Sequence, residues 1–137
     1  MKNLLIAVAV LMLLSGCAVA KASAGDLNRT SWTLVRLNGA DLIPESVVTL
    51  HFEDGAVSGN AGCNTYGSSY TVEDEQITMG EAFSTMMYCM DPEGLMDQEL
   101  AYLTALRTAA TFQIEGDTLT LRDADGNAIG EFRASED

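Results

Sequence analysis

Residues 85–90, Thr-Met-Met-Tyr-Cys-Met, place one cysteine beside three methionines. Thioether and thiolate sulfur are soft ligands suited to Cu(I), so Cys89 and its neighbours could hold a soft metal. Methionine is equally an adaptable filler of protein cores, and Cys89 could instead be one half of a disulfide. Dedicated methionine copper sites repeat Met at fixed intervals or add histidine, and neither pattern occurs here. The compartment in which the chain works therefore decides between these alternatives.

The first seventeen residues are typical of an export signal. Lys2 is followed by an apolar run from Leu4 to Leu14, too short for a membrane-spanning helix of about 20 residues. The sequence Leu-Ser-Gly-Cys that ends at Cys17 resembles the lipobox of bacterial lipoproteins, in which lipid is added to the cysteine and the signal is cleaved just before it. We therefore predict a signal peptide over residues 1–16 and lipid attachment at Cys17.

The resemblance to a lipobox also predicts where the protein resides. Ala18 is not the Asp that retains lipoproteins in the inner membrane of enterobacteria, so the resemblance implies an outer-membrane lipoprotein that faces the periplasm. Residues 17–28 are rich in Ala, Ser and Gly and are predicted to form a short tether. We expect residues 29–137 to form one domain with its own core, because 137 residues less a signal of 16 leaves 121.

The acidic character of the chain limits its partners. It has 20 Asp and Glu against 7 Lys and Arg, which gives a formal net charge of −13. Removal of the signal takes Lys2 away and makes this charge more negative by one unit. Such a surface repels nucleic acid, so no nucleic-acid partner is expected. The lipid on Cys17, rather than charge, would hold the protein at the membrane.

Cys63 and Cys89 are the two cysteines that remain once the lipobox has taken Cys17. Thiols persist poorly in an exported, oxidising compartment, so this pair favours a disulfide. Closing a loop of 26 residues would stabilise the fold by about 3 kcal/mol on the chain-entropy description. Two reduced buried thiols and a thiolate metal site are the competing interpretations.

Short alternating segments separated by turn signals predict a domain rich in strands. Val48, Leu50 and Phe52 share one face of a strand that ends at Asp54-Gly55. The other predicted strands lie at 31–37, 56–72, 76–79, 111–115, 118–122 and 128–133, and the glycines within 56–72 are expected to mark bulges or bends. The fold class is therefore mainly β (α+β), a small antiparallel β-barrel-like sheet of about seven or eight strands with one α-helix packed on it.

One long helix is predicted after the sulfur-rich segment. Asp91 suits an N-cap and Pro92 suits the first helical position. Apolar residues then recur at helical spacing, at Met96, Leu100, Leu103, Leu106 and Ala110. We expect this stripe to face the core and the methionines near Cys89 to fill the space beneath it.

His51 is the only histidine, so a serine hydrolase would have one possible base. The chain has no Gly-x-Ser-x-Gly motif, and His51 lies on the strand face opposite Leu50 and Phe52. We expect an exposed strand residue rather than a catalytic one. Hydrolysis is kept as an alternative function, since loss of a hydrolytic activity on His51→Ala would establish it.

Two acidic clusters are better explained as turns than as metal sites. Asp123 begins an Asp-Ala-Asp-Gly-Asn sequence that resembles the start of a calcium loop, but the later ligands are missing and strands flank it. The run at residues 73–75 is likewise expected to be a solvated turn. No metal or other cofactor is therefore predicted.

Three segments together resemble the META domain of the HslJ-like heat-shock lipoproteins. They are the segment at 58–72, which begins Ser-Gly-Asn-Ala-Gly-Cys-Asn-Thr-Tyr, the segment at 83–106, which begins Phe-Ser-Thr-Met-Met-Tyr-Cys and runs into the helical pattern, and the closing Leu-x-Leu hairpin at 111–126. The resemblance covers residues 31–133, including Trp32 and Leu34. One departure is Gly67, which stands one place earlier than in the family pattern Tyr-x-Gly-x-Tyr.

This resemblance implies a small β-barrel-like domain without catalytic activity. Its relatives are associated with envelope stress, including heat shock, and some with novobiocin resistance. They often pair the two motif cysteines, which correspond here to Cys63 and Cys89. The expected function is thus non-enzymatic, with a monomer binding an unknown envelope protein or small ligand at the surface or mouth of the barrel. Periplasmic binding of Cu(I) by Cys89 and nearby Met is the first alternative.

Overall fold

A computed structural model describes residues 27–136 of the chain. The predicted signal peptide, the lipid-attachment residue Cys17 and the tether up to residue 26 lie outside the described residues. Within residues 27–136, no helix is long and apolar enough to cross a membrane.

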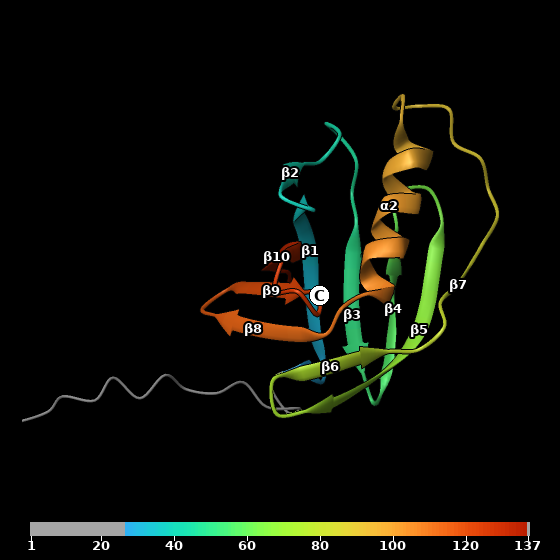
Figure 1. Cartoon of the computed structure of the whole chain (residues 1–137). Helices are drawn as coiled ribbons and strands as arrows, with labels where there is room; N and C mark the ends of the chain where they lie inside the picture. Colours follow the sequence, from blue (N-terminus) through green and yellow to red (C-terminus); the bar gives the residue numbers. More distant parts are fainter. Residues whose placement is uncertain (1–26, 137) are drawn as a thin grey trace, which may run out of the picture.

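The domain is a closed antiparallel barrel with one helix packed against it (Figure 1). Eight strands form the barrel, and their bounds are β1 Thr30–Leu37, β3 Thr49–Glu53, β4 Ala56–Asn60, β5 Thr65–Glu73, β6 Gln76–Met79, β8 Thr111–Glu115, β9 Thr118–Arg122 and β10 Ala128–Ala134. Two short strands are added at its margins, β2 Ala40–Asp41 beside β1 and β7 Phe83–Ser84 beside β5. The helix, α2, spans Leu95–Arg107. The predicted fold class is confirmed.

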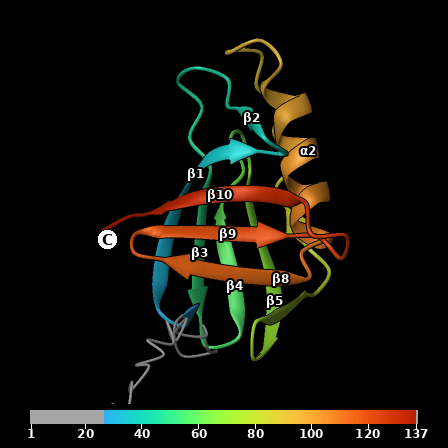
Figure 2. The same cartoon turned by 60° about the vertical axis from the view of Figure 1, so that its left-hand side comes forward.

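Closure of the barrel is unequal on its two sides. The strands follow the order β1-β3-β4-β5-β6-β8-β9-β10, and β10 then pairs with β1 from Trp32↔Ala134 to Leu37↔Gly130. Between β6 and β8 the pairing is limited to Gln76↔Thr111. Figure 2 shows β8, β9 and β10 crossing in front of β3, β4 and β5, so the sheet folds back on itself.

Alternation along the strands builds a single core, because successive side chains point to opposite faces of a strand. Val48, Leu50 and Phe52 are fully buried, as their spacing predicted. The glycines of residues 56–72 mark a bend rather than a bulge: the chain turns at Gly62 between β4 and β5. These two strands pair without a register shift, and register shifts lie instead in β1 and β10. The core also contains residues from other elements, including Trp32, Leu34, Val57, Ile77, Tyr102, Leu106, Phe112, Leu119, Leu121, Ile129 and Phe132.

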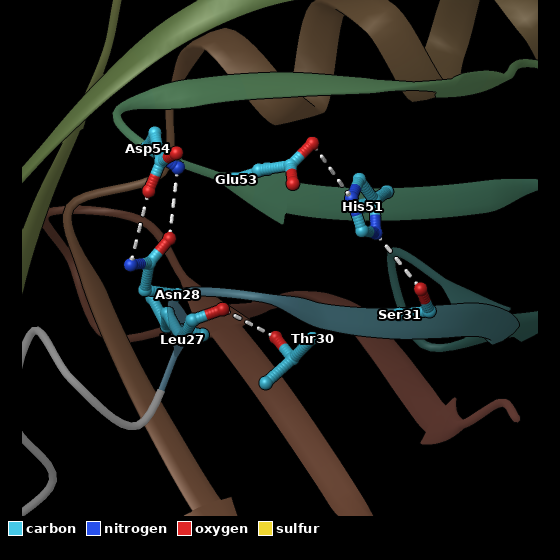
Figure 3. Close-up of polar contacts among 7 residues, drawn as sticks. All are labelled: Leu27, Asn28, Thr30, Ser31, His51, Glu53 and Asp54. Carbon is cyan, nitrogen blue, oxygen red and sulfur yellow. Dashed lines mark hydrogen bonds and ion pairs between the residues drawn. The ribbon is translucent and has the colours of Figure 1, made fainter. Parts of the chain in front are cut away.

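The domain begins earlier than the predicted boundary at residue 29. Leu27 is fully buried, and its carbonyl accepts a hydrogen bond from the Thr30 hydroxyl. The side chain of Asn28 accepts a hydrogen bond from the backbone N–H of Asp54 at 2.8 Å (Figure 3). The last two residues of the expected tether therefore belong to the folded domain.

The helix begins three residues later than the sequence predicted, at Leu95 rather than Pro92. Gly94 is its N-cap and has φ 83°, a left-handed conformation that a continuous helix does not allow. The N–H of Leu95 donates to the carbonyl of Pro92, so residues 92–95 form a turn before the helix. The signals at Asp91 and Pro92 therefore belong to this turn.

The buried face of α2 also differs from the predicted apolar stripe. Leu100 is 67% exposed, and Met96 and Leu103 are half-buried. The face in contact with the barrel consists of Leu95, Glu99, Tyr102, Ala105 and Leu106. A hydrophobic pattern misses this face because two of its members, Glu99 and Tyr102, carry polar atoms that become hydrogen-bonded on burial.

Tyr66 and Tyr102 join β5 to α2 through their hydroxyl groups, 2.6 Å apart. Tyr66 also donates to the carbonyl of Thr49 at 2.9 Å, so Tyr102 donates to the Tyr66 oxygen. Burial raises the pKa of both phenols above the usual value of 10.0. Both are therefore neutral in the fold over the pH range in which an unfolded chain would ionise them.

We expect alkaline unfolding to coincide with ionisation of these two tyrosines. The folded pKa values are raised, so their contribution to stability is complete below pH 10.0 and is lost as the pH rises above that value. The measurement is tyrosinate absorbance followed together with circular dichroism during an alkaline titration. Ionisation of Tyr66 and Tyr102 before any loss of β-structure would contradict the prediction, and Tyr102→Phe serves to assign the late absorbance change.

Candidate functional site

Cys63 and Cys89 form a disulfide, as predicted. Cys63 lies in the loop between β4 and β5, and Cys89 lies in the segment that leads from β7 to α2. The bond therefore attaches a long connection to the wall of the barrel.

Asn64, next to Cys63, binds the same connection through its side-chain amide. Its Oδ1 accepts hydrogen bonds from the Thr85 hydroxyl at 2.8 Å and the Met87 N–H at 2.7 Å. Its Nδ2 donates to the Met87 carbonyl at 3.1 Å and to Glu99 Oε1 at 2.6 Å. One buried amide thus fixes the connection and α2 relative to the barrel.

Glu99 completes this arrangement from the helix. Its Oε2 accepts hydrogen bonds from the backbone N–H groups of Cys63 at 2.8 Å and Asn64 at 2.7 Å. Together with the Asn64 amide, these donors give the buried carboxylate three hydrogen bonds. A buried carboxylate is stable only when it is paired or well hydrogen-bonded. The Gly-Cys-Asn turn at 62–64 therefore supplies a cradle for Glu99.

The methionines near Cys89 do not fill the core, contrary to the prediction. Met86 is 97% exposed and Met90 is 83% exposed. Their neighbours Phe83, Met87 and Tyr88 are also more than half exposed. The side chains point outward because the backbone of this segment, and not its side chains, is bound by Asn64 and the disulfide. We call residues 83–90 the apolar segment.

Gly67 provides the surface on which the apolar segment begins. An added Cβ at Gly67 would lie 2.6 Å from the ring of Phe83, so any other residue would displace that ring. This contact explains why β7 lies directly against β5. Gly67 stands one place earlier than in the Tyr-x-Gly-x-Tyr pattern of the family, and β5 is nevertheless a regular strand at this position.

A hollow of about 190 Å³ lies beside the disulfide, at the end of the apolar segment. Tyr88, Cys89, Met90, Leu95 and Met96 contribute to its lining. The N–H of Cys89 donates to the sulfur of Met96 at 3.4 Å. Because the sulfur of Cys89 is bonded to Cys63, it is not available as a thiolate for a soft metal. Glu93 and Asp97 also line the hollow, so it combines apolar side chains with carboxylates.

Acidic residues border the apolar segment on both sides. Glu81 precedes it, and Asp91, Glu93 and Asp97 follow it, all exposed. The sequence has no Lys or Arg between Arg36 and Arg107, so this part of the surface carries uncompensated negative charge. The site therefore combines exposed apolar side chains with an acidic border.

His51 lies away from this site, on β3, opposite Ser31 of the neighbouring strand β1 (Figure 3). Its Nδ1 is 2.8 Å from the Ser31 hydroxyl, and its Nε2 is 3.7 Å from Glu53 Oε2. The histidine is half-buried rather than exposed as expected. A hollow of about 480 Å³ adjoins it, with Trp32, Thr49 and Ser135 also in its lining.

The order serine, histidine and glutamate resembles a catalytic triad. The backbone N–H groups around it, however, are engaged in strand pairing and are not arranged as donors for an oxyanion. An acyl-transfer site needs backbone or side-chain donors aimed at a developing oxyanion. Around Ser31, β1 is paired with β3 on one side and with β10 on the other, and the Ser31 carbonyl accepts the N–H of Ser135. The N–H groups at this point belong to the barrel ladders, so the contacts are those of a cross-strand polar pair.

The Asp123 loop is a hairpin turn between β9 and β10, as predicted. Its carboxylate accepts hydrogen bonds from the N–H groups of Asp125 and Asn127 and from the Asn127 side chain. These bonds to Asn127 lower the pKa of Asp123. Residues 74 and 75 likewise form the turn between β5 and β6, and Glu73 ends β5. Neither place gathers three His, Cys, Asp or Glu side chains suited to a metal, nor does any other part of residues 27–136.

The sequence of the META domain family matches residues 25–136, which is most of the chain. The chain belongs to the META domain family. Its Gly-Cys-Asn turn, its disulfide and helix α2 are thus parts of a META barrel. The family match also includes Leu27 and Asn28, in agreement with their place in the fold.

Solved structures share this META fold. A protein from Burkholderia xenovorans solved by NMR is 27% identical, has a TM-score of 0.65, and the match covers 81% of this chain and 85% of that one. A DUF4847 family protein from Bacteroides vulgatus is 14% identical with a TM-score of 0.59, over 82% of this chain and 97% of that one, and so shows the fold alone. Among curated proteins, none has a sequence that matches this chain.

Proposed function

We propose that this META protein is a lipid-anchored, non-enzymatic domain of the bacterial cell envelope that acts in tolerance of heat or novobiocin-type stress by binding a partner protein. Lipid on Cys17 would attach it to the outer membrane, facing the periplasm. The apolar segment, residues 83–90, would be its binding surface. The domain would act as a monomer with one partner.

The exposure of the apolar segment carries this proposal. Large apolar side chains gathered on the surface of a soluble domain mark places where other molecules bind. Here Phe83, Met86, Met87, Tyr88 and Met90 are exposed although their backbone is fixed by Asn64 and the disulfide. A fixed backbone lowers the entropy lost on binding. Methionine side chains are also flexible enough to adapt to a partner.

Replacing Met86 and Met90 together by serine is expected to abolish partner binding without unfolding the barrel, because both side chains are almost fully exposed. The measurement is photo-crosslinking in living cells from a reactive group at residue 87, with growth under heat and novobiocin followed in parallel. Val35→Ser is the matched control, since Val35 is also an exposed apolar residue but lies on β1.

The proposal would be wrong if the methionine variant crosslinked and protected cells as the wild type does. Mass spectrometry of the mature protein from the same cells tests the anchor, with Cys17→Ser as the control, because lipid on Cys17 adds acyl mass that the variant cannot carry. A mature wild-type protein without this added mass would refute lipid attachment at Cys17.

A further inference from the structure

We infer that the outer edge of β7 binds an extended segment of a partner protein, which joins the barrel as an additional strand and carries lysine or arginine among apolar residues. The inference rests on the proposed function, because it specifies how the apolar segment binds. Three features support it: the backbone groups along this edge, the side chains around it and the charge that borders it.

The backbone of β7 presents unpaired groups to solvent. Ser84 lies opposite Tyr66 in the antiparallel pairing with β5, and the next residue, Thr85, donates its N–H to the carbonyl of Thr65 at 3.0 Å. Hydrogen-bonded and non-hydrogen-bonded pairs alternate in such a ladder. Ser84 therefore directs its N–H and C=O away from β5, and β5 is the strand with which β7 pairs within residues 27–136.

The same alternation continues into the apolar segment. Met87 turns its N–H and C=O inward, and both bind the side chain of Asn64. Because the N–H groups of Thr85 and Met87 both bind inward, we infer that the backbone groups of Met86, between them, face outward. Ser84 and Met86 thus form a short row of donors and acceptors two residues apart, which is what an added strand requires.

The side chains around this edge suit apolar residues of such a strand. Met86, Tyr88 and Met90 flank the outward-facing backbone groups and are exposed. The hollow beside the disulfide lies at the end of the row and is large enough for one or two side chains at about 190 Å³. In a strand added at an edge, main-chain hydrogen bonds supply affinity and such pockets supply specificity.

The acidic border determines the charge of the partner. Glu93 and Asp97 line the hollow beside Tyr88 and Met90, and Glu81 and Asp91 are exposed residues next to the apolar segment in the sequence. Complementary charge accelerates and orients protein association. Lysine or arginine in the added strand would face these carboxylates. A second copy of this chain would bring a formal net charge of −13 to the same surface. The charge therefore favours a basic partner over self-association.

Ser84→Pro separates strand addition from contacts made by side chains alone. Proline removes the outward N–H of Ser84, which the barrel does not use, and it is tolerated on edge strands for this reason. Ser84→Ala is the matched control, because it also loses the hydroxyl but keeps the N–H. The probe is a short peptide of alternating lysine and valine, compared with the same peptide bearing glutamate for lysine and with one N-methylated at alternate residues.

Binding to the full chain is measured by NMR titration and amide hydrogen exchange. The lysine-valine peptide is expected to bind the wild type and Ser84→Ala, to slow exchange of the Met86 N–H, and to bind Ser84→Pro about tenfold more weakly. The glutamate peptide and the N-methylated peptide are expected to bind much more weakly than the lysine-valine peptide.

Failure of the lysine-valine peptide to bind the wild type would overturn the inference. Equal affinity of Ser84→Pro and Ser84→Ala, or tight binding of the N-methylated peptide, would overturn it too. In that case partner crosslinking at the apolar segment could persist through side-chain contacts, and the proposed function would survive. Protection of the Met86 N–H that rises with protein concentration, without peptide, would identify a second copy as the occupant and refute the basic partner.

Discussion

Replacing both Cys63 and Cys89 by alanine is expected to lower the free energy of unfolding by about 3 kcal/mol. The disulfide closes a loop of 26 residues, and its loss gives the unfolded chain more conformations. It also removes a covalent attachment of the apolar segment. The measurement is denaturant unfolding of the double variant and the oxidised wild type, together with proteolysis at residues 83–90.

Reduction supplies the control for this prediction. A mild reductant should lower the stability of the wild type to that of the double variant and leave the double variant unchanged. The apolar segment should then be cleaved faster in both. Equal stability of the variant and the oxidised wild type would show that the native contacts, with Asn64 and Glu99, are sufficient without the disulfide.

Replacing Glu99 by glutamine is expected to destabilise the domain by about 2–3 kcal/mol. The carboxylate accepts two backbone N–H groups on one oxygen and the Asn64 amide on the other. A glutamine side chain offers one acceptor oxygen, and its amide nitrogen would face a donor. Asn64 would lose part of its own support, so the contact of its amide with Met87 would weaken as well.

Asp97→Asn is the matched control for Glu99→Gln. Asp97 belongs to the same helix but is exposed, so its replacement should change stability little. Denaturant unfolding measures both variants, and NMR shifts of the amides of residues 85–89 report on the apolar segment. Coinciding unfolding curves for the two variants would show that the buried hydrogen bonds of Glu99 do not support the fold.

The strands could be predicted from the sequence because side chains alternate between the two faces of a strand. This alternation produces both the apolar pattern in the sequence and the burial in the structure. Val48, Leu50 and Phe52 alternate along the chain and are all buried, and turns at Asp54-Gly55 and Asp123 end strands where their residue types predicted. The bounds of β1, β3, β6, β8 and β9 therefore differ little from expectation. Closure between β1 and β10 follows from pairing of residues far apart in the chain, which no local pattern specifies.

The helix could be predicted only in part. Its existence follows from the periodic leucines, but its start depends on Gly94, whose left-handed conformation outweighs the capping signal at Asp91. Its orientation depends on Glu99 and Tyr102, which are buried because Asn64 and Tyr66 satisfy their polar atoms. The hydrogen-bond partner of a buried carboxylate comes from the tertiary fold and not from the local sequence. The hydrophobic pattern therefore indicated the neighbouring helix face, which contains Leu100.

The disulfide of the candidate site was predicted from the sequence, but the exposed apolar surface of the site was not. Two cysteines in an oxidising compartment were enough to predict the pair Cys63 and Cys89. The outward direction of Met86 and Met90 was not predictable, because it results from backbone capture by Asn64. The Gly-Cys-Asn motif was the sequence feature that could have indicated this arrangement. An asparagine and two N–H groups in a tight turn are suited to hold a carboxylate.

The narrow contact between β6 and β8 is the place where the strands of the barrel would separate most easily. Two hydrogen bonds hold the pair Gln76↔Thr111, from the Ile77 N–H to the Ala110 carbonyl and from the Phe112 N–H to the Glu75 carbonyl. On the opposite side, β1 pairs with β3 over Thr30–Thr33 and with β10 over Trp32–Leu37. Opening at this contact would therefore separate β3 to β6 from β8 to β10, with β1 still paired to both groups of strands. Helix α2 lies between the two groups of strands in the sequence. It therefore connects them and opposes their separation.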